Sequence, residues 1–425
     1  MGDTIFALSS GALPAAVAIV RCSGPRAIAA GHQLAGSLPP PRQLGLRALI
    51  AADGALIDRA LVVQFPGPST ATGEDLLEFH LHGGRAVVAR LLDELGRIPG
   101  LRPAEPGEFT RRALVNGRLD LTEAEGLGDL LAAETEWQRR AAAQAAGGAL
   151  SRQIEEWRSA LLLLAAEAEA AIDYVDEEET ELDLSALARR ASGLASQWRE
   201  WLRAPRSETL SEGLSVVLAG PPNAGKSSLF NALIGDDKAI VTAIPGTTRD
   251  LIEARLDVEG LPLTLVDTAG LRDSDDEVER IGVSRAARAQ ATADILLWLG
   301  DPNDAPAHPH RLLLIARADA RSLEEPHPGS IAVSARTGEG IDRLRREVAE
   351  IARTLLPPPD RATLNLRQAQ VLSAAADALE LARADDALLT AEAVRQALHA
   401  LDRMTGRQST EDMLDTLFSR FCLGK

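Results

Sequence analysis

The most constraining feature of the sequence is an apolar run that ends in a glycine-rich pattern. The run covers residues 214–219, and residues 220–227 follow it with the spacing G-x-x-x-x-G-K-S. Glycines at these positions let backbone N–H groups converge on phosphate oxygens, and the N-terminus of a following helix adds the positive end of its dipole. The pattern predicts a strand, a phosphate-binding loop and a helix, with Lys226 at the β- and γ-phosphates and Ser227 at a Mg²⁺ ion.

Two further polar motifs follow in the order that a GTPase needs. Residues 246–250 read G-T-T-R-D, where a threonine hydroxyl completes the Mg²⁺ shell. The apolar run 261–266 then leads into D-T-A-G, which places Asp267 at the carboxyl end of a buried strand beside the phosphate loop. Asp267 is expected to hold Mg²⁺ through water, and the Gly270 N–H to meet the γ-phosphate. Each tetrapeptide alone is also typical of a capped turn, but their joint order favours nucleotide binding.

The motif for base recognition departs from the usual N-K-x-D. After the apolar run 312–315 the chain reads A-R-A-D at 316–319. Asp319 remains to accept hydrogen bonds from N1 and N2 of guanine, and the Arg317 stem can cover the base. A strand at 331–333 then delivers S-A-R, a loop whose backbone N–H meets guanine O6. We expect GTP rather than ATP, since a carboxylate facing adenine lacks matched donors, and weaker binding because Ala316 replaces asparagine.

Composition indicates a multi-domain protein of the cytoplasm. At 425 residues the chain exceeds one hydrophobic core. With 45 Lys and Arg against 62 Asp and Glu, its formal charge of −17 argues against nucleic-acid binding over the whole surface, so any RNA contact is local or shared with a partner. Cys22 and Cys422 form no C-x-x-C pattern and are expected to be reduced. No stretch approaches about 20 apolar residues, so no membrane association is expected.

The pattern along the chain predicts an α/β plus all-α fold. Residues 1–118 mix strand-like and helix-like runs and form a small α/β domain. Residues 119–212 and 357–425 are rich in Ala, Leu, Glu and Arg at helical spacing. Between them, residues 213–356 alternate in the manner of a nucleotide-binding α/β domain. We therefore expect one helical domain interrupted by an inserted P-loop GTPase (G) domain.

Several motifs together give the chain a specific resemblance. They are Asn223 within the phosphate loop, A-I-V-T at 239–242 leading to Asp250, D-E-V-E-R-I-G at 276–282, P-G-P at 66–68, T-G-E-D at 72–75, H-G-G at 82–84, P-G-E-F at 106–109 and the terminal F-C-L-G-K at 421–425. The sequence resembles the MnmE (TrmE) family of tRNA-modification GTPases over essentially its whole length. Ala316 and Arg317 are the departure from that family's pattern.

The resemblance implies a set of nucleotide and metal contacts. The implied GTP-binding residues are Asn223, Ala224, Gly225, Lys226, Ser227, Ser228, Thr242, Thr247, Thr248, Asp267, Thr268, Ala269, Gly270, Asp319, Ser334, Ala335 and Arg336. The implied Mg²⁺ ligands are Ser227 and Thr248, and the implied K⁺ ligands are Asn223, Thr242, Ile244 and Thr247. The implied catalytic, water-orienting residue is Glu279. From the residues alone, Asn223 also suits an unusual loop conformation and Glu279 a solvated helix charge.

The resemblance also implies a second site in the amino-terminal domain. There the family's fold is like that of tetrahydrofolate-binding proteins, mediates a homodimer, and binds 5-formyl-tetrahydrofolate or a related one-carbon folate. The matching residues are Arg21, Glu78, Arg118 and Lys425, with Cys422 as a second catalytic candidate. The alternatives are surface ion pairs for the first three and a packed thiol for Cys422. His80 and His82 share a predicted strand face, but no third metal ligand is apparent.

The implied function is a potassium-assisted, dimeric GTPase. With the FAD-dependent protein MnmG, in a heterotetramer, such an enzyme places an aminomethyl or carboxymethylaminomethyl group on C5 of the wobble uridine, position 34, of certain tRNAs. The rival functions are a regulatory GTPase switch in ribosome assembly or stress signalling, and an ATP-dependent scaffold. Folate binding separates the first rival from the modification enzyme. The tRNA species and the amino donor, glycine or ammonium, stay open.

Overall fold

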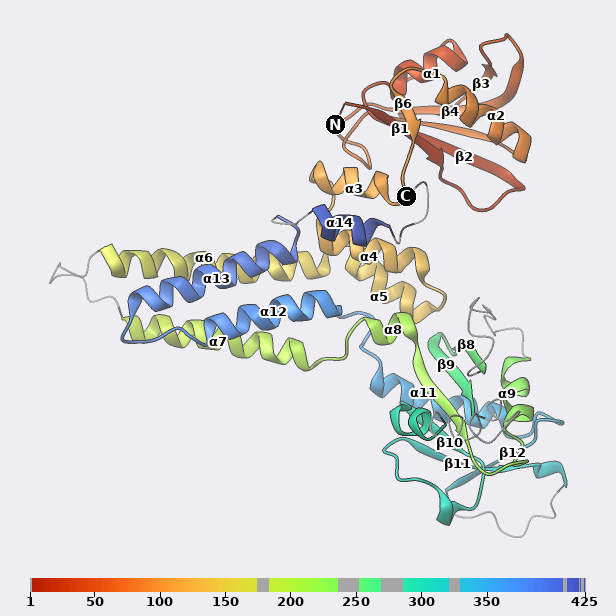
Figure 1. The fold of residues 1–425 in the computed structure, drawn as a ribbon, viewed down its shortest axis with the longest axis vertical. Helices are drawn as coiled ribbons and strands as arrows, with labels where there is room; N and C mark the ends of the chain where they lie inside the picture. The colour runs from red at the N-terminus through yellow and green to blue at the C-terminus, as the bar shows by residue number, and fades with distance from the viewer. Residues whose placement is uncertain are drawn as a thin grey trace, which may run out of the picture. The chain divides into compact units, whose positions relative to one another are not determined.

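The computed structural model describes residues 2–173, 183–235, 252–268, 286–320, 329–407 and 411–419, together with positions 421 and 424. Its contacts divide the chain into two compact units (Figure 1). Unit 1 comprises Met1–Glu125 and Asp402–Lys425, and unit 2 comprises Gly126–Leu401. No helix within the described ranges is long and apolar enough to cross a membrane.

Unit 1 is built on a six-stranded mixed sheet in the order β3-β4-β5-β2-β1-β6. Its elements are β1 (Thr4–Leu8), β2 (Ala15–Ser23), α1 (Ala27–Ala35), β3 (Gly45–Ile50), β4 (Leu56–Phe65), β5 (Leu76–Gly83), α2 (Arg85–Gly96), β6 (Leu101–Pro103) and α3 (Glu108–Val115). Alternate strand residues such as Val20, Val62 and Phe79 point to one face and form a core with Leu91 of α2. The strand-like runs of residues 1–118 at 17–21, 61–65 and 76–81 form β2, β4 and β5, each strand longer than its run by a few residues.

The opposite face of this sheet is covered at one end only. There Ile5 and Ala7 of β1 pack on Phe109 of α3. At the β3–β4 end, Leu46 and Leu61 pair across the strands and are exposed. The sheet therefore has a helix-covered core face and a second face that is open over β3 and β4.

The carboxyl-terminal part of unit 1 packs against α3. Helix α14 (Glu411–Phe418) approaches the start of α3 so closely that a Cβ on Gly107 would lie 2.6 Å from the Phe418 carbonyl oxygen. Gly107 has a φ of 70°, so only glycine suits both the backbone conformation and the contact. Leu121 and Phe418 share a small buried cluster. Segments far apart in the sequence thus form one compact unit.

Unit 2 contains antiparallel helices and a second sheet. The helices outside the second sheet's domain are α4 (Leu121–Ala132), which crosses from unit 1, α5 (Glu136–Ala146), α6 (Ala149–Asp173), α7 (Leu184–Arg203), α8 (Glu208–Glu212), α12 (Leu366–Leu379) and α13 (Ala387–Met404), which ends in unit 1. Trp157 of α6 and Trp198 of α7 are buried edge to face, with ring centroids 5.7 Å apart. Capping boxes at Thr135 and Asn365 start α5 and α12. The predicted long helices are confirmed.

The second sheet has the order β12-β11-β10-β7-β9-β8, parallel except for β8. Its domain contains β7 (Leu214–Ala219), α9 (Lys226–Ile234), β8 (Ile252–Val258), β9 (Leu261–Asp267), β10 (Ile295–Trp298), β11 (Arg311–Ala316), β12 (Ser330–Val333), α11 (Ile341–Leu355) and short 3-10 turns at Pro302–Asp304 and Ala318–Ala320. The four predicted strands at 214, 261, 312 and 331 are confirmed. The division of the whole chain into three domains at 118, 213 and 356 stays a prediction.

Candidate nucleotide-binding site

The phosphate loop connects β7 to α9 through unusual backbone angles. Gly220, Asn223 and Gly225 have φ values of 143°, 60° and 100°. A Cβ on Gly220 would lie 2.3 Å from the Leu299 carbonyl oxygen, so this position excludes every other residue. Asn223 is the non-glycine residue in the loop that takes a left-handed conformation, which asparagine tolerates better than most residues. The predicted strand, loop and helix are confirmed.

Lys226 lies at the start of α9 and is 8% exposed. Its Nζ donates to the carbonyl oxygens of Gly220 and Pro221, both at 2.9 Å. The ammonium group is thereby held over the loop whose N–H groups are expected to bind phosphate. Ser227 follows on the first turn of the helix and is exposed.

Asp267 is the last residue of β9 and is paired in register with Leu218 of β7. It is buried, with 1% exposure, and the next residue, Thr268, donates its hydroxyl to the Leu218 carbonyl oxygen at 2.8 Å. Parallel strands end at the same edge of a sheet, which brings this carboxylate beside the phosphate loop. The placement is that expected of a group that reaches a phosphate-bound Mg²⁺ through water.

A cavity of about 440 Å³ joins the phosphate loop to the base-recognition segments. Its lining is Gly225, Ser228, Leu229, Ala316, Arg317, Asp319, Ala320, Val333, Ala335 and Arg336. A Cβ on Gly225 would lie 3.5 Å from the Ala316 Cβ, so the position of the missing asparagine borders the phosphate loop directly. Residues of the phosphate loop and of the predicted base-recognition segments thus line one cavity of the size that small ligands occupy.

Asp319 is held by two donors within this cavity. The Ser334 hydroxyl donates to its Oδ1 at 2.6 Å, and Arg336 Nε donates to its Oδ2 at 2.7 Å. These hydrogen bonds, with that from Ser334 the stronger influence, lower the pKa of Asp319 below its ordinary value of 3.8. The group is therefore an ionised acceptor at neutral pH. Sequence reasoning assigned Arg336 through its backbone alone and did not anticipate the Arg336–Asp319 ion pair, which no spacing pattern signals.

Arg317 adopts a φ of 58°, and its Nη2 lies 3.5 Å from the Asn223 carbonyl oxygen. Its side chain therefore reaches over the phosphate loop from the base-recognition segment. This position agrees with the expectation that the Arg317 stem covers one face of the base.

Several predicted site residues lie outside the described residues. They are Thr242, Ile244, Thr247, Thr248, Ala269, Gly270, Glu279, Cys422 and Lys425. The K⁺ ligand set, the water-orienting glutamate and the terminal thiol accordingly stay predictions. Within the part of the chain that is described, no cluster of three or more His, Cys, Asp or Glu side chains is arranged to hold a metal ion.

Two of the predicted folate residues lie together on the open face of the unit 1 sheet. Arg21 and Glu78 are paired in register on β2 and β5, with Arg21 Nη2 2.8 Å and Nε 2.9 Å from Glu78 Oε1. The Arg21 guanidinium also lies 5.9 Å from the centre of the Phe109 ring. Arg118 is exposed near the loop at Gly73, where a Cβ would lie 3.3 Å from its Cγ. The structure describes no contact between Arg118 and the Arg21–Glu78 pair.

The two histidines next to Glu78 contact different carboxylates. His80 Nε2 lies 3.1 Å from Glu78 Oε2, whereas His82 Nδ1 lies 2.8 Å from Asp58 Oδ1. They make separate histidine–carboxylate contacts, and a shared metal site at this pair is not supported. Cys22, on the core face of the same sheet, is buried and unpaired, and burial raises the pKa of its thiol.

The chain's end returns to β1. Ser9 Oγ donates to the Gly424 carbonyl oxygen at 2.9 Å, and a Cβ on Gly424 would lie 2.1 Å from the Leu8 carbonyl oxygen. Leu8 is paired with Val20, the neighbour of Arg21. The terminal segment therefore reaches the strands that carry the Arg21–Glu78 pair.

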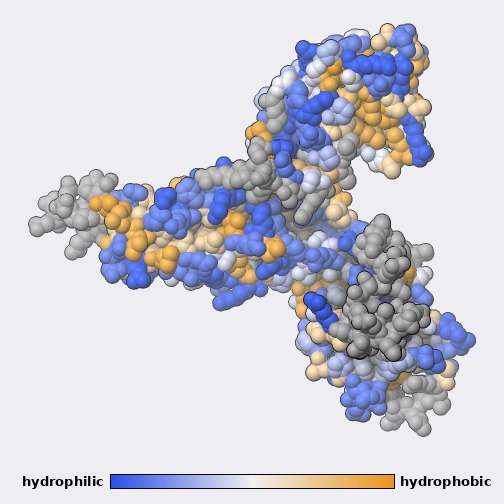
Figure 2. Space-filling view, in the orientation of Figure 1, coloured by the Kyte–Doolittle hydropathy of each residue, from blue (hydrophilic) through white to orange (hydrophobic). Residues whose placement is uncertain are grey.

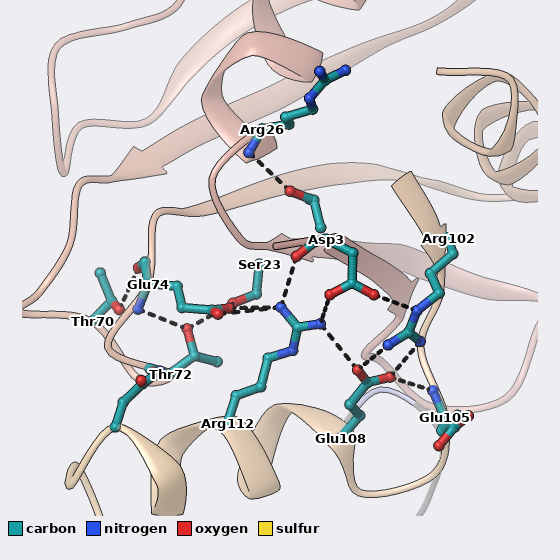
Figure 3. Close-up of polar contacts among 12 residues, drawn as sticks. Asp3, Ser23, Arg26, Thr70, Thr72, Glu74, Arg102, Glu105, Glu108 and Arg112 are labelled. Atoms are coloured by element: carbon teal, nitrogen blue, oxygen red, sulfur yellow. Dashed lines mark hydrogen bonds and ion pairs between the residues drawn. The ribbon is translucent and has the colours of Figure 1, made fainter. Parts of the chain in front are cut away.

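An ionic cluster around a fully buried arginine, missed by sequence reasoning, lies beside these strands (Figure 3). We define the Arg112 cluster as Asp3, Glu74, Arg102, Glu108 and Arg112. Arg112 is fully buried, and its guanidinium lies 3.0 Å from carboxylate oxygens of Asp3, Glu74 and Glu108. Arg102 bridges Asp3 and Glu108, both at 2.6 Å. The cluster fastens the loop before β5 and the start of β1 to α3.

The carboxylates of the cluster titrate below their ordinary range. Burial works to raise the pKa of Glu108, but hydrogen bonds from Arg102, the Glu105 backbone and Arg112 outweigh it and lower the pKa. The pKa of Asp3 is lowered in the same way by Arg102 and Arg112 against the effect of burial. Both groups are therefore ionised at neutral pH, as an arginine-bridged cluster requires.

Comparisons with known proteins cover the full chain. A family described as "MnmE helical domain" matches residues 121–422, and one described as "GTP-binding protein TrmE N-terminus" matches residues 4–118. A protein of Rhizorhabdus wittichii named "tRNA modification GTPase MnmE" is 54% identical over 428 residues, covering 100% of this chain and 97% of its own length. A protein of Erythrobacter litoralis with the same name is 51% identical over 425 residues and 100% of both chains.

Among solved structures, the G domain of the T. maritima FeoB iron transporter is 29% identical, covers 33% of this chain and 98% of its own, and gives a TM-score of 0.25. The identity with the two full-length relatives and the two family matches carry the assignment. This chain belongs to the MnmE (TrmE) family.

Proposed function

We propose that this chain is a tRNA-modification GTPase. The observation that carries the proposal is the convergence of Lys226, Asp267 and Asp319 around one phosphate loop and its adjoining cavity, in a chain half identical to full-length relatives of that name. Asp319 is an ionised acceptor and therefore suits the N1–H and N2–H donors of guanine.

Hydrolysis rests on placement and electrostatics. Lys226 exchanges its two carbonyl partners for the β- and γ-phosphate oxygens, a charge-assisted contact that is stronger than the neutral one it replaces. Ser227 and, through water, Asp267 hold Mg²⁺, which when bound neutralises charge between the β- and γ-phosphates. Glu279 orients the attacking water in this proposal, with Thr248 as the second Mg²⁺ ligand.

A potassium ion replaces an arginine finger in the proposal, held by Asn223, Thr242, Ile244 and Thr247. Asn223 supports this, because it is exposed on the phosphate loop and its side-chain carbonyl oxygen is a hard ligand of the kind that such a cation takes. We expect faster GTP hydrolysis in K⁺ than in Na⁺ at equal ionic strength, and Asn223→Ala should remove the difference. Equal rates in both salts would exclude a bound cation of this kind.

The product is a modified wobble uridine, made with MnmG in the cytoplasm, where the tRNA substrate is found. The test is mass spectrometry of tRNA nucleosides from cells that lack this chain, rescued by the wild type or by Lys226→Ala. Loss of carboxymethylaminomethyl and aminomethyl uridine, restored by the wild type alone, is expected. An unchanged nucleoside profile would favour a regulatory switch instead.

The amino-terminal domain binds a one-carbon folate in this proposal. The Arg21–Glu78 pair supports it, since a guanidinium suits a folate carboxylate or carbonyl and a carboxylate suits pterin N–H donors. Arg118, Lys425 and the thiol of Cys422 complete the site. Arg118→Ala should weaken binding of 5-formyl-tetrahydrofolate, and Cys422→Ser should abolish tRNA modification while sparing GTP hydrolysis. Full modification by Cys422→Ser would reduce the thiol to a packing role.

The open face of the unit 1 sheet supports a homodimer. Val17, Leu46 and Leu61 are 53%, 59% and 42% exposed on the same face, and Figure 2 shows hydrophobic side chains gathered over this part of the sheet. An apolar sheet face of this kind is typical of an interface with a second copy. The double variant Leu46→Asp, Leu61→Asp should sediment as a monomer, whereas Leu163→Asp, at an exposed position of α6, should not change the mass.

A further inference from the structure

Arg336 and a guanine base require the same oxygen of Asp319. Guanine presents N1–H and N2–H side by side, and the two donors together need both oxygens of a carboxylate. Arg336 Nε donates a hydrogen bond to Asp319 Oδ2 at 2.7 Å, and the Ser334 hydroxyl donates one to Asp319 Oδ1 at 2.6 Å. A hydroxyl leaves a further lone pair of Oδ1 available, but the larger guanidinium of Arg336 already takes Oδ2, the second oxygen that the base edge needs.

The two donors are chemically alike. The N1–C2–N2 edge of guanine is itself a guanidine unit, and the guanidinium of arginine is a planar fork that matches a carboxylate in the same geometry. The Arg336 side chain is 77% exposed, so it can swing into solvent without losing packing. Asp319 is 16% exposed and sits on the lining of the cavity, so it stays in place.

We propose that Arg336 is an affinity-determining residue that competes internally with guanine for Asp319, so that the base binds only after the Arg336–Asp319 pair has opened. The proposal rests on the guanine-nucleotide binding proposed above. When only a fraction of the protein is in its binding-competent state, the apparent affinity for the ligand is reduced by that fraction. Because exposed ion pairs are weak, the expected reduction is about two- to fivefold.

Simple electrostatics makes the opposite prediction. Arg336 is a cation close to a site for a polyanionic nucleotide, so removing it should slow association if it acted only through its charge. In the competition proposed here, Arg336→Ala instead speeds association and tightens binding. The sign of the effect therefore separates the two roles.

The experiment measures association and dissociation rates of a ribose-labelled fluorescent GDP with the full chain by stopped flow. Arg336→Ala should raise the association rate constant and lower Kd by about two- to fivefold relative to the wild type. Arg343→Ala is the matched control, because Arg343 is an exposed arginine of α11 whose ion pair with Glu347 spans 4.0 Å. It should show no gain.

A second background tests the pair itself. Asp319→Asn replaces the carboxylate by an amide that can donate to the 2-carbonyl of xanthine, and it leaves Arg336 no anion to bind. In this background Arg336→Ala should not tighten binding of labelled XDP. A gain there, or an unchanged or weaker GDP affinity of Arg336→Ala in the normal background, overturns the proposal. Failure of the wild type to bind GDP at all would instead overturn the proposed function.

Discussion

At the scale of single residues, base recognition depends on one acidic side chain whose usual partner is missing. Asp319 is positioned by Ser334 and ionised, but Ala316 offers no amide on the side that faces Gly225. The remaining acceptor still discriminates between bases, because adenine presents an acceptor at the atom where guanine presents N1–H. Selectivity is thus expected to survive while affinity falls.

Ala316→Asn should tighten GTP binding. One recovered neutral hydrogen bond is worth about 0.5–1.5 kcal/mol, or roughly two- to tenfold in Kd. The measurement is displacement of a labelled nucleotide by GTP and by ATP in the wild type and the variant. Equal competition by ATP and GTP in the wild type would contradict the guanine preference itself. An unchanged GTP affinity of the variant would show that alanine at position 316 does not weaken GTP binding.

The position of a site residue in the fold can be predicted from the sequence when its neighbours in the sequence determine that position. Lys226 and Asp267 were predictable because Lys226 ends the glycine-rich loop after β7 and Asp267 ends β9, and parallel strands end at one edge of a sheet. Arg336 with Asp319, and Arg112 with Asp3, were not, because each pair joins separate segments through charges that carry no periodic signal. Arg118 was assigned by resemblance, and its contact with a folate stays a prediction.

At the scale of elements, α3 is held to the unit 1 sheet by charge as well as by packing. Strands β2, β4 and β5 were predictable as short apolar runs, whereas β1, β3 and β6 were not predicted; in β3, exposed Leu46 and buried Leu49 lie on different faces of the sheet. What fixes α3 is the Arg112 cluster, whose central arginine has three carboxylate partners and no exposure. A cluster of this type is costly to break at one member.

Arg112→Met should destabilise unit 1 by about 3–5 kcal/mol, because the variant roughly keeps the volume but removes the cation that pairs with Glu74 and leaves Asp3 and Glu108 with Arg102 alone. The measurement is the urea midpoint and slope of the full chain by circular dichroism. Arg111→Ala on the same helix is the control, since Arg111 pairs at 2.8 Å with Asp415, which is 62% exposed. It should cost less than about 1 kcal/mol. Equal losses of unfolding free energy in Arg112→Met and Arg111→Ala would show that the Arg112 cluster does not stabilise unit 1.

The same cluster predicts an acid-sensitive stability. The pKa values of Asp3 and Glu108 are lower in the folded chain than their ordinary values of 3.8 and 4.5. Groups whose pKa is depressed by folding stabilise the fold above the ordinary pKa and lose that contribution as the pH falls through the folded one. The urea midpoint should therefore drop below about pH 4.5, and less steeply in Arg112→Met. Parallel pH profiles of the two proteins would contradict this assignment.

At the scale of the whole molecule, α5 joins the helical part of unit 2 to the G domain. Trp137 packs on the G-domain core, its backbone N–H donates to the Gly260 carbonyl oxygen, and its indole Nε1 donates to the Pro357 carbonyl oxygen, both at 3.0 Å. Gly260 is in the turn between β8 and β9, and Pro357 follows α11. One residue therefore contacts the hairpin that leads to Asp267 through its backbone and the segment where the chain leaves the G domain through its side chain.

This contact predicts that the two parts of unit 2 unfold together. Gln138 Nε2 donates to the Leu210 carbonyl oxygen at 2.8 Å, and Arg140 pairs with Asp360 at 2.5 Å in an exposed and therefore weak contact. The apolar packing of α5 on the G-domain core rests on Trp137 and the small side chain of Ala141. Trp137→Ala should cost about 2–4 kcal/mol, less than for a fully buried tryptophan because Trp137 is only partly buried. Trp137→Phe keeps most of the packing and loses only the indole hydrogen bond, worth about 1 kcal/mol.

Differential scanning calorimetry with and without saturating GDP measures the coupling. Ligand that binds only the folded G domain raises the melting temperature of everything that unfolds cooperatively with it. In the wild type and in Trp137→Phe, GDP should therefore shift the transition that includes the helices of unit 2. In Trp137→Ala the transition should split, and GDP should shift only the G-domain part, because the remaining junction contacts are too weak to transmit the stabilisation. A single GDP-shifted transition in Trp137→Ala would mean that the junction is held by contacts other than this side chain.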